Sequence, residues 1–178
     1  MLLPIVYNTS SYEKVETLKC LEGLVDIYLP DLKYKNNMLS LKYSNAPDYF
    51  EIADKAIDEM VRQTKNIKFK DGIMKKGVIV RHMILPGNTK DSKDIILHLH
   101  NKYGKKIYVS IMNQYTPLSE LQSYPEINRK ITKREYEKVI DYAVDIGVEN
   151  AFIQFGETAN ESFIPNFEEA EILNELKE

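Results

Sequence analysis

The chain has 178 residues, of which 43% are hydrophobic and 29% are charged, and its formal net charge is −3. These values fit a single globular domain and exclude collagen-like and disordered chains. No apolar run reaches the roughly 20 residues that span a bilayer, and the negative charge favours neither nucleic acid nor a membrane as a partner. The single cysteine, Cys20, excludes a disulfide framework and a multi-cysteine metal site. Because MLLPIVYNTSSY lacks the basic flank of a signal peptide, we expect a cytoplasmic protein.

Strand and helix patterns alternate along the first half of the chain. The apolar runs PIVY, at 4–7, and VDIYL, at 25–29, predict strands. Between these runs, Ser10 with Glu13 predicts a capping box that opens a helix, in which we expect Cys20 to be buried. A second predicted helix follows Pro47, and its apolar stripe is formed by Ile52, Ala53, Ala56, Ile57, Met60 and Val61.

The second half of the chain continues the alternation. Three further runs, VIVRHMIL (78–85), IYVSIM (107–112) and AFIQF (151–155), predict strands. The intervening helices are predicted to begin at Ser92 and at a capping box formed by Thr132 and Glu135. Residues 166–178 are acidic and predict a C-terminal helix.

This alternation predicts a single α/β domain, residues 1–178, with parallel strands. Five strands are too few to close a (β/α)8 barrel, so we expect a partial, incomplete TIM-type barrel. The first predicted strand has the apolar character of an interior strand. If it lies at an edge, its unpaired backbone groups invite pairing with another polypeptide or with a second copy of this chain.

Polar residues gather where the predicted strands end, the place where parallel α/β folds carry their ligands. In chain order the candidates for ligand binding are Asn8, Thr9, Ser10, Asp31, Lys33, Arg81, Gln114 and Tyr115. An arginine clamps a carboxylate with two parallel hydrogen bonds, and an aspartate holds an ammonium group or a ribose hydroxyl. The set therefore suits a zwitterionic ligand with a carboxylate.

Each candidate also has a structural interpretation. Ser10 can serve as a helix cap alone, and Asp31 with Lys33 can form a surface ion pair of little energetic value. Arg81 is the one charged residue in an apolar strand, which favours function, whereas His82 beside it is more typical of a structural histidine. His98 and His100 lie two apart on a helix and do not share a face, so we expect no metal site.

Four segments together, LPIVYNTSSYE, VDIYLPDLKY, GVIVRHMILPGN and SIMNQYTP, resemble the C-terminal half of a radical S-adenosylmethionine (radical SAM) protein. The group they resemble is the one related to pyruvate formate-lyase activating enzyme. The resemblance extends through AFIQF and implies a partial barrel that binds S-adenosylmethionine and a four-iron (4Fe–4S) cluster. It also implies an oxidoreductase that abstracts hydrogen from a glycyl radical enzyme or another substrate.

The resemblance assigns cofactor contacts to individual residues. Asn8-Thr9-Ser10 matches a strand-end segment that reads Asp-Thr-Asn in the activating enzymes, near the methionyl end of the cofactor. Asp31 and Lys33 match a D-x-K pair, and Arg81 matches an arginine that precedes a Pro-Gly turn and faces the cofactor carboxylate. Gln114-Tyr115 stands where the activating enzymes have Pro-Tyr-His.

The chain lacks the CxxxCxxC segment whose thiolates hold the family's cluster, as well as a Gly-Gly-Glu-type motif. Without three thiolates a 4Fe–4S cluster cannot be held, so we expect the chain alone to be inactive toward S-adenosylmethionine. The missing N-terminal half is then an expected partner.

Two alternatives remain open at the level of the sequence. In the first, the chain is a non-catalytic module that pairs through its first strand. In the second, it is a barrel lyase that uses Lys33 as an imine-forming amine, which requires a desolvated lysine.

Overall fold

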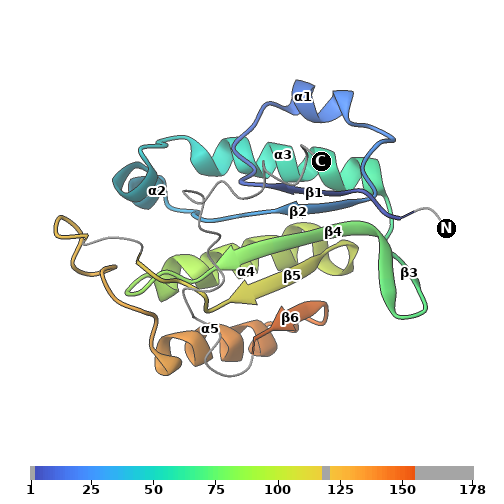
Figure 1. The fold of residues 1–178 in the computed structure, drawn as a ribbon. Helices are drawn as coiled ribbons and strands as arrows, with labels where there is room; N and C mark the ends of the chain where they lie inside the picture. The colour runs from blue at the N-terminus through green and yellow to red at the C-terminus, as the bar shows by residue number, and fades with distance from the viewer. Residues whose placement is uncertain (1–2, 118–120, 155–178) are drawn as a thin grey trace, which may run out of the picture.

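A computed structural model describes residues 3–117 and 121–154 (Figure 1). Its strands are β1 (Val6–Thr9), β2 (Ile27–Pro30), β3 (Lys68–Lys70), β4 (Ile73–Met83), β5 (Tyr108–Met112) and β6 (Ala151–Ile153). Its helices are α1 (Val15–Cys20), α2 (Asn37–Ser44), α3 (Tyr49–Thr64), α4 (Thr89–Tyr103) and α5 (Lys133–Asp145), with a 3-10 turn at Gly104–Lys106. Within these ranges no helix combines the length and apolar character needed to cross a membrane. The predicted helix at 166–178 lies outside the described residues.

The strands form one sheet in the order β1-β2-β4-β5-β6, and every pair along this path is parallel. The predicted α/β class with a parallel sheet is therefore confirmed. No described residues pair β1 with β6, so closure into a barrel is not observed. The five predicted strands are all present, and β3 adds a sixth that pairs antiparallel with β4.

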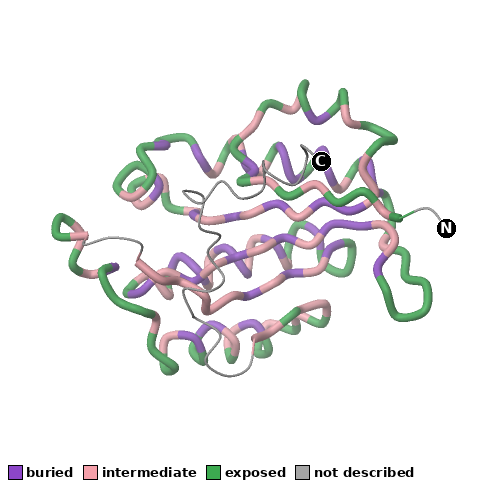
Figure 2. Tube along the Cα trace, in the orientation of Figure 1, coloured by how far each residue is buried: buried purple, intermediate pink, exposed green. Residues whose placement is uncertain are grey.

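The two faces of the sheet have different surroundings. On one face, strand residues such as Tyr28, Val80 and Ile111 are buried beneath α3, α4 and α5, which pack along one side of the sheet (Figures 1 and 2). The alternate residues, among them Ile79, Arg81 and Ser110, face the other way and are only partly buried. No described helix covers this second face.

Strand β1 lies at an edge of the described sheet, the case that the sequence left open. Its only described strand partner is β2, and Leu3, Ile5 and Val6 are exposed. Large apolar side chains beside free backbone groups are a surface that folded proteins usually cover.

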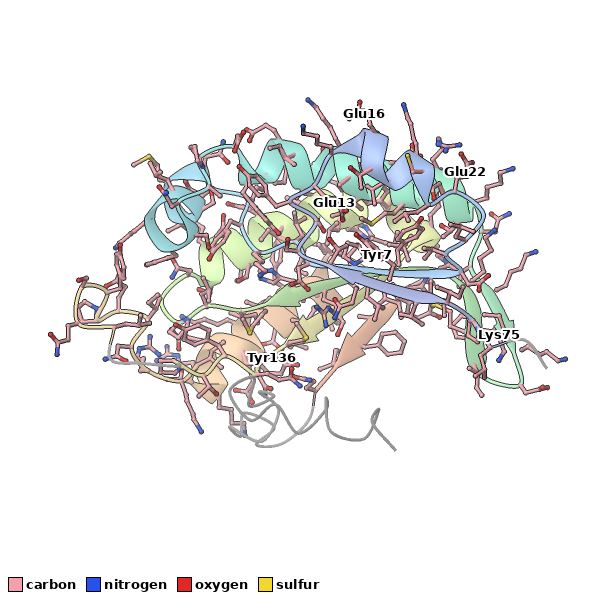
Figure 3. The ribbon with its side chains drawn as sticks, turned by 45° about the horizontal axis from the view of Figure 1, so that its top comes forward. Tyr7, Glu13, Glu16, Glu22, Lys75 and Tyr136 are labelled. Carbon is pink, nitrogen blue, oxygen red and sulfur yellow. The ribbon has the colours of Figure 1, made fainter. Side chains whose placement is uncertain are left out.

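The predicted capping box at Ser10 and Glu13 is wrong. Helix α1 begins at Val15 after Lys14, because Ser11 has a φ of 63° that turns the chain away from a capping geometry. Glu13 instead accepts hydrogen bonds from Tyr7 Oη at 3.0 Å and from Thr9 Oγ1 at 2.5 Å, and Figure 3 shows Tyr7 and Glu13 between β1 and the helices. The other predicted box, Thr132 with Glu135, is present at the start of α5.

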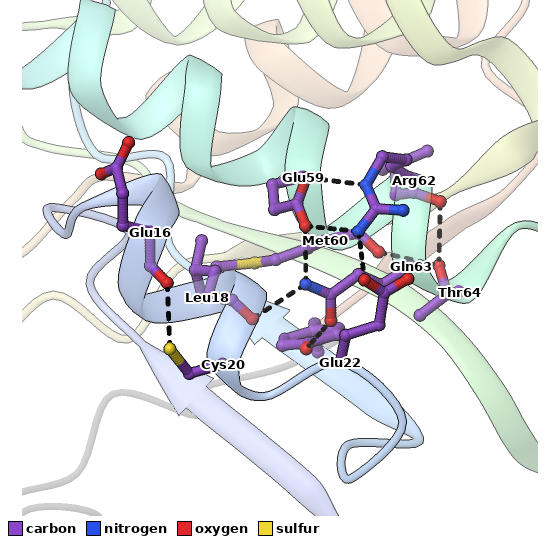
Figure 4. Close-up of polar contacts among 11 residues, drawn as sticks. Glu16, Leu18, Cys20, Glu22, Glu59, Met60, Arg62, Gln63 and Thr64 are labelled. Atoms are coloured by element: carbon purple, nitrogen blue, oxygen red, sulfur yellow. Dashed lines mark hydrogen bonds and ion pairs between the residues drawn. The ribbon is translucent and has the colours of Figure 1, made fainter.

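A polar network joins α1 to α3 (Figure 4). Buried Gln63 donates to the carbonyl oxygen of Leu18 and to Glu59, and it accepts from the hydroxyl of Tyr28. Glu59 also pairs with Arg62 at 2.7 Å, and this ion pair lowers the pKa of Glu59 to about 2. Cys20 is exposed rather than buried, since α1 turns only its Leu18 side fully inward.

Three further elements differ from the sequence-based expectation. Helix α2 forms within a polar stretch that carries no helical stripe, capped by the Asn36 side chain at the Met38 amide. Helix α4 begins after Asn88 rather than at Ser92, which is buried in its first turn. Asp71 and Gly72 form the two-residue turn of the unpredicted β3–β4 hairpin, and both have positive φ. Positive φ at both residues gives the turn the same twist as the paired strands.

Candidate functional site

Three predicted residues meet at the carboxyl ends of β2 and β4. Asp31 Oδ1 lies 2.9 Å from Nε and 2.7 Å from Nη2 of Arg81, and Asp31 Oδ2 lies 3.7 Å from Nζ of Lys33. Their side chains are 18%, 28% and 42% exposed, respectively, so ligand and solvent can reach them. Because only Nε and Nη2 of Arg81 have acceptors among the described residues, Nη1 is available to a second carboxylate.

Backbone hydrogen bonds fix this charged group between the strands. The amide of Asp31 donates to Thr9 O at 2.9 Å, and the amide of Leu32 donates to Arg81 O at 2.9 Å. Asp31 and Arg81 are also neighbours in an isolated parallel bridge. Parallel neighbours point to the same face, so both side chains lie on the face that no described helix covers.

The segment Asn8-Thr9-Ser10 does not act as one unit. Asn8 pairs in register with Leu29, two residues before Asp31, so Asn8 shares the uncovered face with Arg81. Thr9 points to the helix-covered side, where its hydroxyl is engaged by Glu13 and by the Ser11 amide. The structure therefore keeps Asn8 as a ligand candidate and gives Thr9 a structural role. Ser10 is exposed directly after the strand.

The loop after β5 carries Gln114 and Tyr115, which are both partly buried. Burial raises the pKa of the Tyr115 hydroxyl, with smaller contributions from Tyr34 and Tyr43, which belong to the segment after β2. Tyr115 therefore lies near residues of the segment that follows β2. No described contact joins Gln114 or Tyr115 to the Asp31–Arg81 pair.

The Pro86-Gly87 turn after β4 is held by the first turn of α5. Glu135 Oε1 accepts from the Gly87 amide at 2.7 Å, and both Glu135 oxygens pair with Arg129 at 2.8 Å. The Arg129 guanidinium is the largest cause that keeps the pKa of Glu135 well below its usual range. The turn therefore has a fixed position at the edge that carries Arg81.

His82 faces the opposite side from Arg81 and is 2% exposed. Its Nδ1 lies 2.8 Å from Leu32 O, whereas its Nε2 is buried with no partner among the described residues. Burial lowers the pKa of the imidazole to about 4. The Nδ1 bond thus supports a structural role for His82, whereas Nε2 has no hydrogen-bond partner among the described residues.

Ser110 is a residue that the sequence-based reasoning missed. It pairs in register with Arg81 on β5, shares its face and is only partly buried. The signal was present in IYVSIM, where Ser110 is the one small polar side chain, between Tyr108 and Met112 on the same side of the strand. Asn8, Asp31, Arg81 and Ser110 together offer an anion, a cation, an amide and a hydroxyl on one face.

The described residues offer no metal centre, and Lys33 is not desolvated. They contain no group of three or more histidine, cysteine or acidic side chains placed to hold a metal ion. The whole sequence has one cysteine, whereas a 4Fe–4S cluster takes four ligands, typically thiolates. Lys33 is 42% exposed and pairs with Asp31 at 3.7 Å, so it does not lie in the apolar, water-excluding pocket that an imine-forming lysine needs.

The chain is 31% identical over 141 residues to "Uncharacterized protein MJ0674" of Methanocaldococcus jannaschii. The match covers 79% of this chain and 38% of that relative, so the chain spans well under half of the relative's length. No protein-family model matches the chain, and no solved structure matches it.

Proposed function

We propose that the chain is the C-terminal portion of a radical SAM protein related to pyruvate formate-lyase activating enzyme. In this proposal it supplies the residues that hold the methionyl end of S-adenosylmethionine. The observation that carries the proposal is the Asp31–Arg81 pair at the carboxyl ends of parallel strands, on the face of the sheet that no described helix covers. The match to a longer relative, of which this chain covers 38%, supports a portion of a larger protein.

The charged group fits the amino-acid end of the cofactor by charge and by donor geometry. Arg81 Nη1 can donate to the cofactor carboxylate while Nε and Nη2 stay on Asp31. Asp31 Oδ2 lies 3.7 Å from Lys33 Nζ, which is too far for a hydrogen bond. This oxygen can therefore accept a hydrogen bond from the cofactor ammonium or from a ribose hydroxyl. Asn8 and Ser110 extend the same face with neutral polar groups.

The iron–sulfur cluster that the resemblance implies does not fit the residues of this chain. A cluster of this type is held by thiolates, and Cys20, the only cysteine, is exposed on α1 rather than at the Asp31–Arg81 edge. The role proposed for this chain is therefore binding and orientation of the cofactor. Hydrogen abstraction from a glycyl radical enzyme or another substrate belongs to the complete protein in this proposal.

Calorimetric titration of the chain with S-adenosylhomocysteine tests the proposed site, because this compound keeps the carboxylate and ammonium but is not cleaved. We expect saturable binding with a stoichiometry of one. If millimolar S-adenosylhomocysteine gives no heat of binding and does not compete with S-adenosylmethionine, the proposed function is contradicted.

The exposed edge of β1 favours a second proposal, in which another polypeptide pairs with that strand. The apolar side chains of Leu3, Ile5 and Val6 and the free edge are the observations that support it. In this proposal the pairing partner is another part of a longer protein, or a second copy of this chain when it is alone. Light scattering of the chain over a concentration series should show reversible self-association, and a monomer at all concentrations would count against the copy as a partner.

A further inference from the structure

Tyr49, in the first turn of α3, connects the two strand-end segments that carry the proposed site. Its hydroxyl lies 3.0 Å from Ser10 O and 2.9 Å from Asp31 O, and it accepts from the Lys33 amide at 3.0 Å. These three backbone groups come from the ends of β1 and β2. One phenol oxygen thus holds the backbone on both sides of Leu32, directly after Asp31, and joins it to Ser10 at the end of β1.

The ring of Tyr49 is held as firmly as its hydroxyl. It is 3% exposed, stacks on Tyr12 at 5.9 Å between centroids and meets Tyr34 edge-on at 5.6 Å. Tyr12 follows β1 and Tyr34 follows β2, so the ring fills the space between the same two segments. Burial raises the pKa of the Tyr49 hydroxyl, which therefore stays protonated and able to donate.

The molecule repeats this arrangement at the other end of the sheet. Tyr136 of α5 donates its hydroxyl to Ile111 O at 3.0 Å and accepts from the Gln154 amide at 2.8 Å, which ties the ends of β5 and β6 together. Figure 3 labels Tyr136 on its helix, beneath the sheet. Tyr136 is 9% exposed, and among the described residues its hydroxyl bonds to the ends of β5 and β6 and not to the segments that carry Asp31 and Lys33. It is a matched control for Tyr49.

We propose that Tyr49 is a positioning residue, whose hydroxyl sets the separation and register of the Asn8–Ser10 and Asp31–Lys33 segments so that they form one ligand site. This inference rests on the proposed function for the identity of the ligand, but the coupling between the two segments can be measured without any ligand. Tyr49 touches no reacting group and acts through the backbone of Asp31 and Lys33. Its ring packing and its hydroxyl contribute separately, because Tyr49→Phe removes only the oxygen.

The ligand-free test is amide hydrogen exchange in Tyr49→Phe and Tyr136→Phe, compared with the parent chain. The reporter is the Asp31 amide, which bonds across the segments to Thr9 O and makes no bond to Tyr49 itself. We expect its exchange to accelerate about ten-fold in Tyr49→Phe and to stay unchanged in Tyr136→Phe. Equal exchange at Asp31 in all three proteins would overturn the positioning role.

The ligand arm compares S-adenosylhomocysteine with 5′-methylthioadenosine, which lacks the amino-acid end. Tyr49→Phe should lose about five-fold or more of the preference for S-adenosylhomocysteine, whereas Tyr136→Phe should keep it, at similar melting temperatures. If the parent chain binds S-adenosylhomocysteine and Tyr49→Phe keeps the full preference, the proposed function stands and the positioning role is contradicted. If the parent chain binds neither compound, the proposed function fails, and the exchange of the Asp31 amide alone decides whether Tyr49 couples the segments.

Discussion

Replacing Arg81 by methionine is expected to weaken binding of S-adenosylhomocysteine by about 100-fold. The lost interaction is the charge-assisted hydrogen bond from Arg81 Nη1 to the ligand carboxylate, and a bond of this kind contributes roughly 1.5–3 kcal/mol. Methionine keeps the length and apolar stem of the side chain, so the packing of β4 is preserved as far as possible. Calorimetry on the parent chain and on Arg81→Met measures the change directly.

Two further variants separate the site from the fold. Arg81→Met leaves the Asp31 carboxylate half-buried without its guanidinium, at a cost of about 1–3 kcal/mol of stability. Adding Asp31→Asn removes this carboxylate, which in Arg81→Met keeps only the 3.7 Å pair with Lys33, so the double variant should regain stability without regaining affinity. Arg134→Met, at an exposed arginine of α5, is the control and should change neither property. An Arg81→Met chain that is stable and binds normally contradicts the assignment of Arg81.

The second large effect is a loss of stability in mild acid that originates at His82. Its imidazole has a pKa of about 4 in the folded chain, against an ordinary value of 6.5, because burial disfavours the charged ring. The unfolded chain therefore binds more protons between these values, and stability declines as the pH falls from 6.5 to 4. The full difference is about 3 kcal/mol, from 1.36 kcal/mol per pKa unit.

Chemical denaturation at a series of pH values measures this dependence. His82→Asn, which retains an amide donor near Leu32 O, should remove most of the slope above pH 4.5. His98→Asn leaves His82 in place and should retain the slope. Glu59, with a pKa of about 2, contributes its own loss only below pH 4.5, and Asp91, whose pKa is raised by burial, acts in the opposite direction. A flat profile between pH 6.5 and 4.5 in the parent chain would falsify the role of His82.

The main features of the fold could be predicted because they depend on local patterns. The five parallel strands are apolar runs separated by amphipathic helices, and Asp31 and Arg81 could be placed together because parallel strands end at a common edge. The capping box at Thr132 was predictable since both partners lie within one helical turn. The strands, helices and capping box depend on residues close in sequence. The meeting of Asp31 and Arg81 follows from the alternation of strands and helices, which places all strand ends at one edge.

The errors have two origins: local conformations and bonds that the sequence patterns do not encode, and contacts between residues far apart in the chain. Glu13 bonds to Tyr7 and Thr9 instead of capping a helix, because Ser11 adopts a positive φ that no pattern announces. Thr9 falls on the helix-covered side since the strand extends further than its apolar run, and alternation then assigns its face. The role of Tyr49 required the positions of two segments 18 and 39 residues away.

The central claim is that this chain recognises the amino-acid end of S-adenosylmethionine through Asp31 and Arg81. The measurement that tests it most directly is the ratio of affinities for S-adenosylhomocysteine and 5′-methylthioadenosine, determined by calorimetry on one preparation. The proposed site predicts at least a ten-fold preference for S-adenosylhomocysteine, and this preference should disappear in Arg81→Met. Equal affinity for the two compounds, or a preference that survives in Arg81→Met, would contradict the claim.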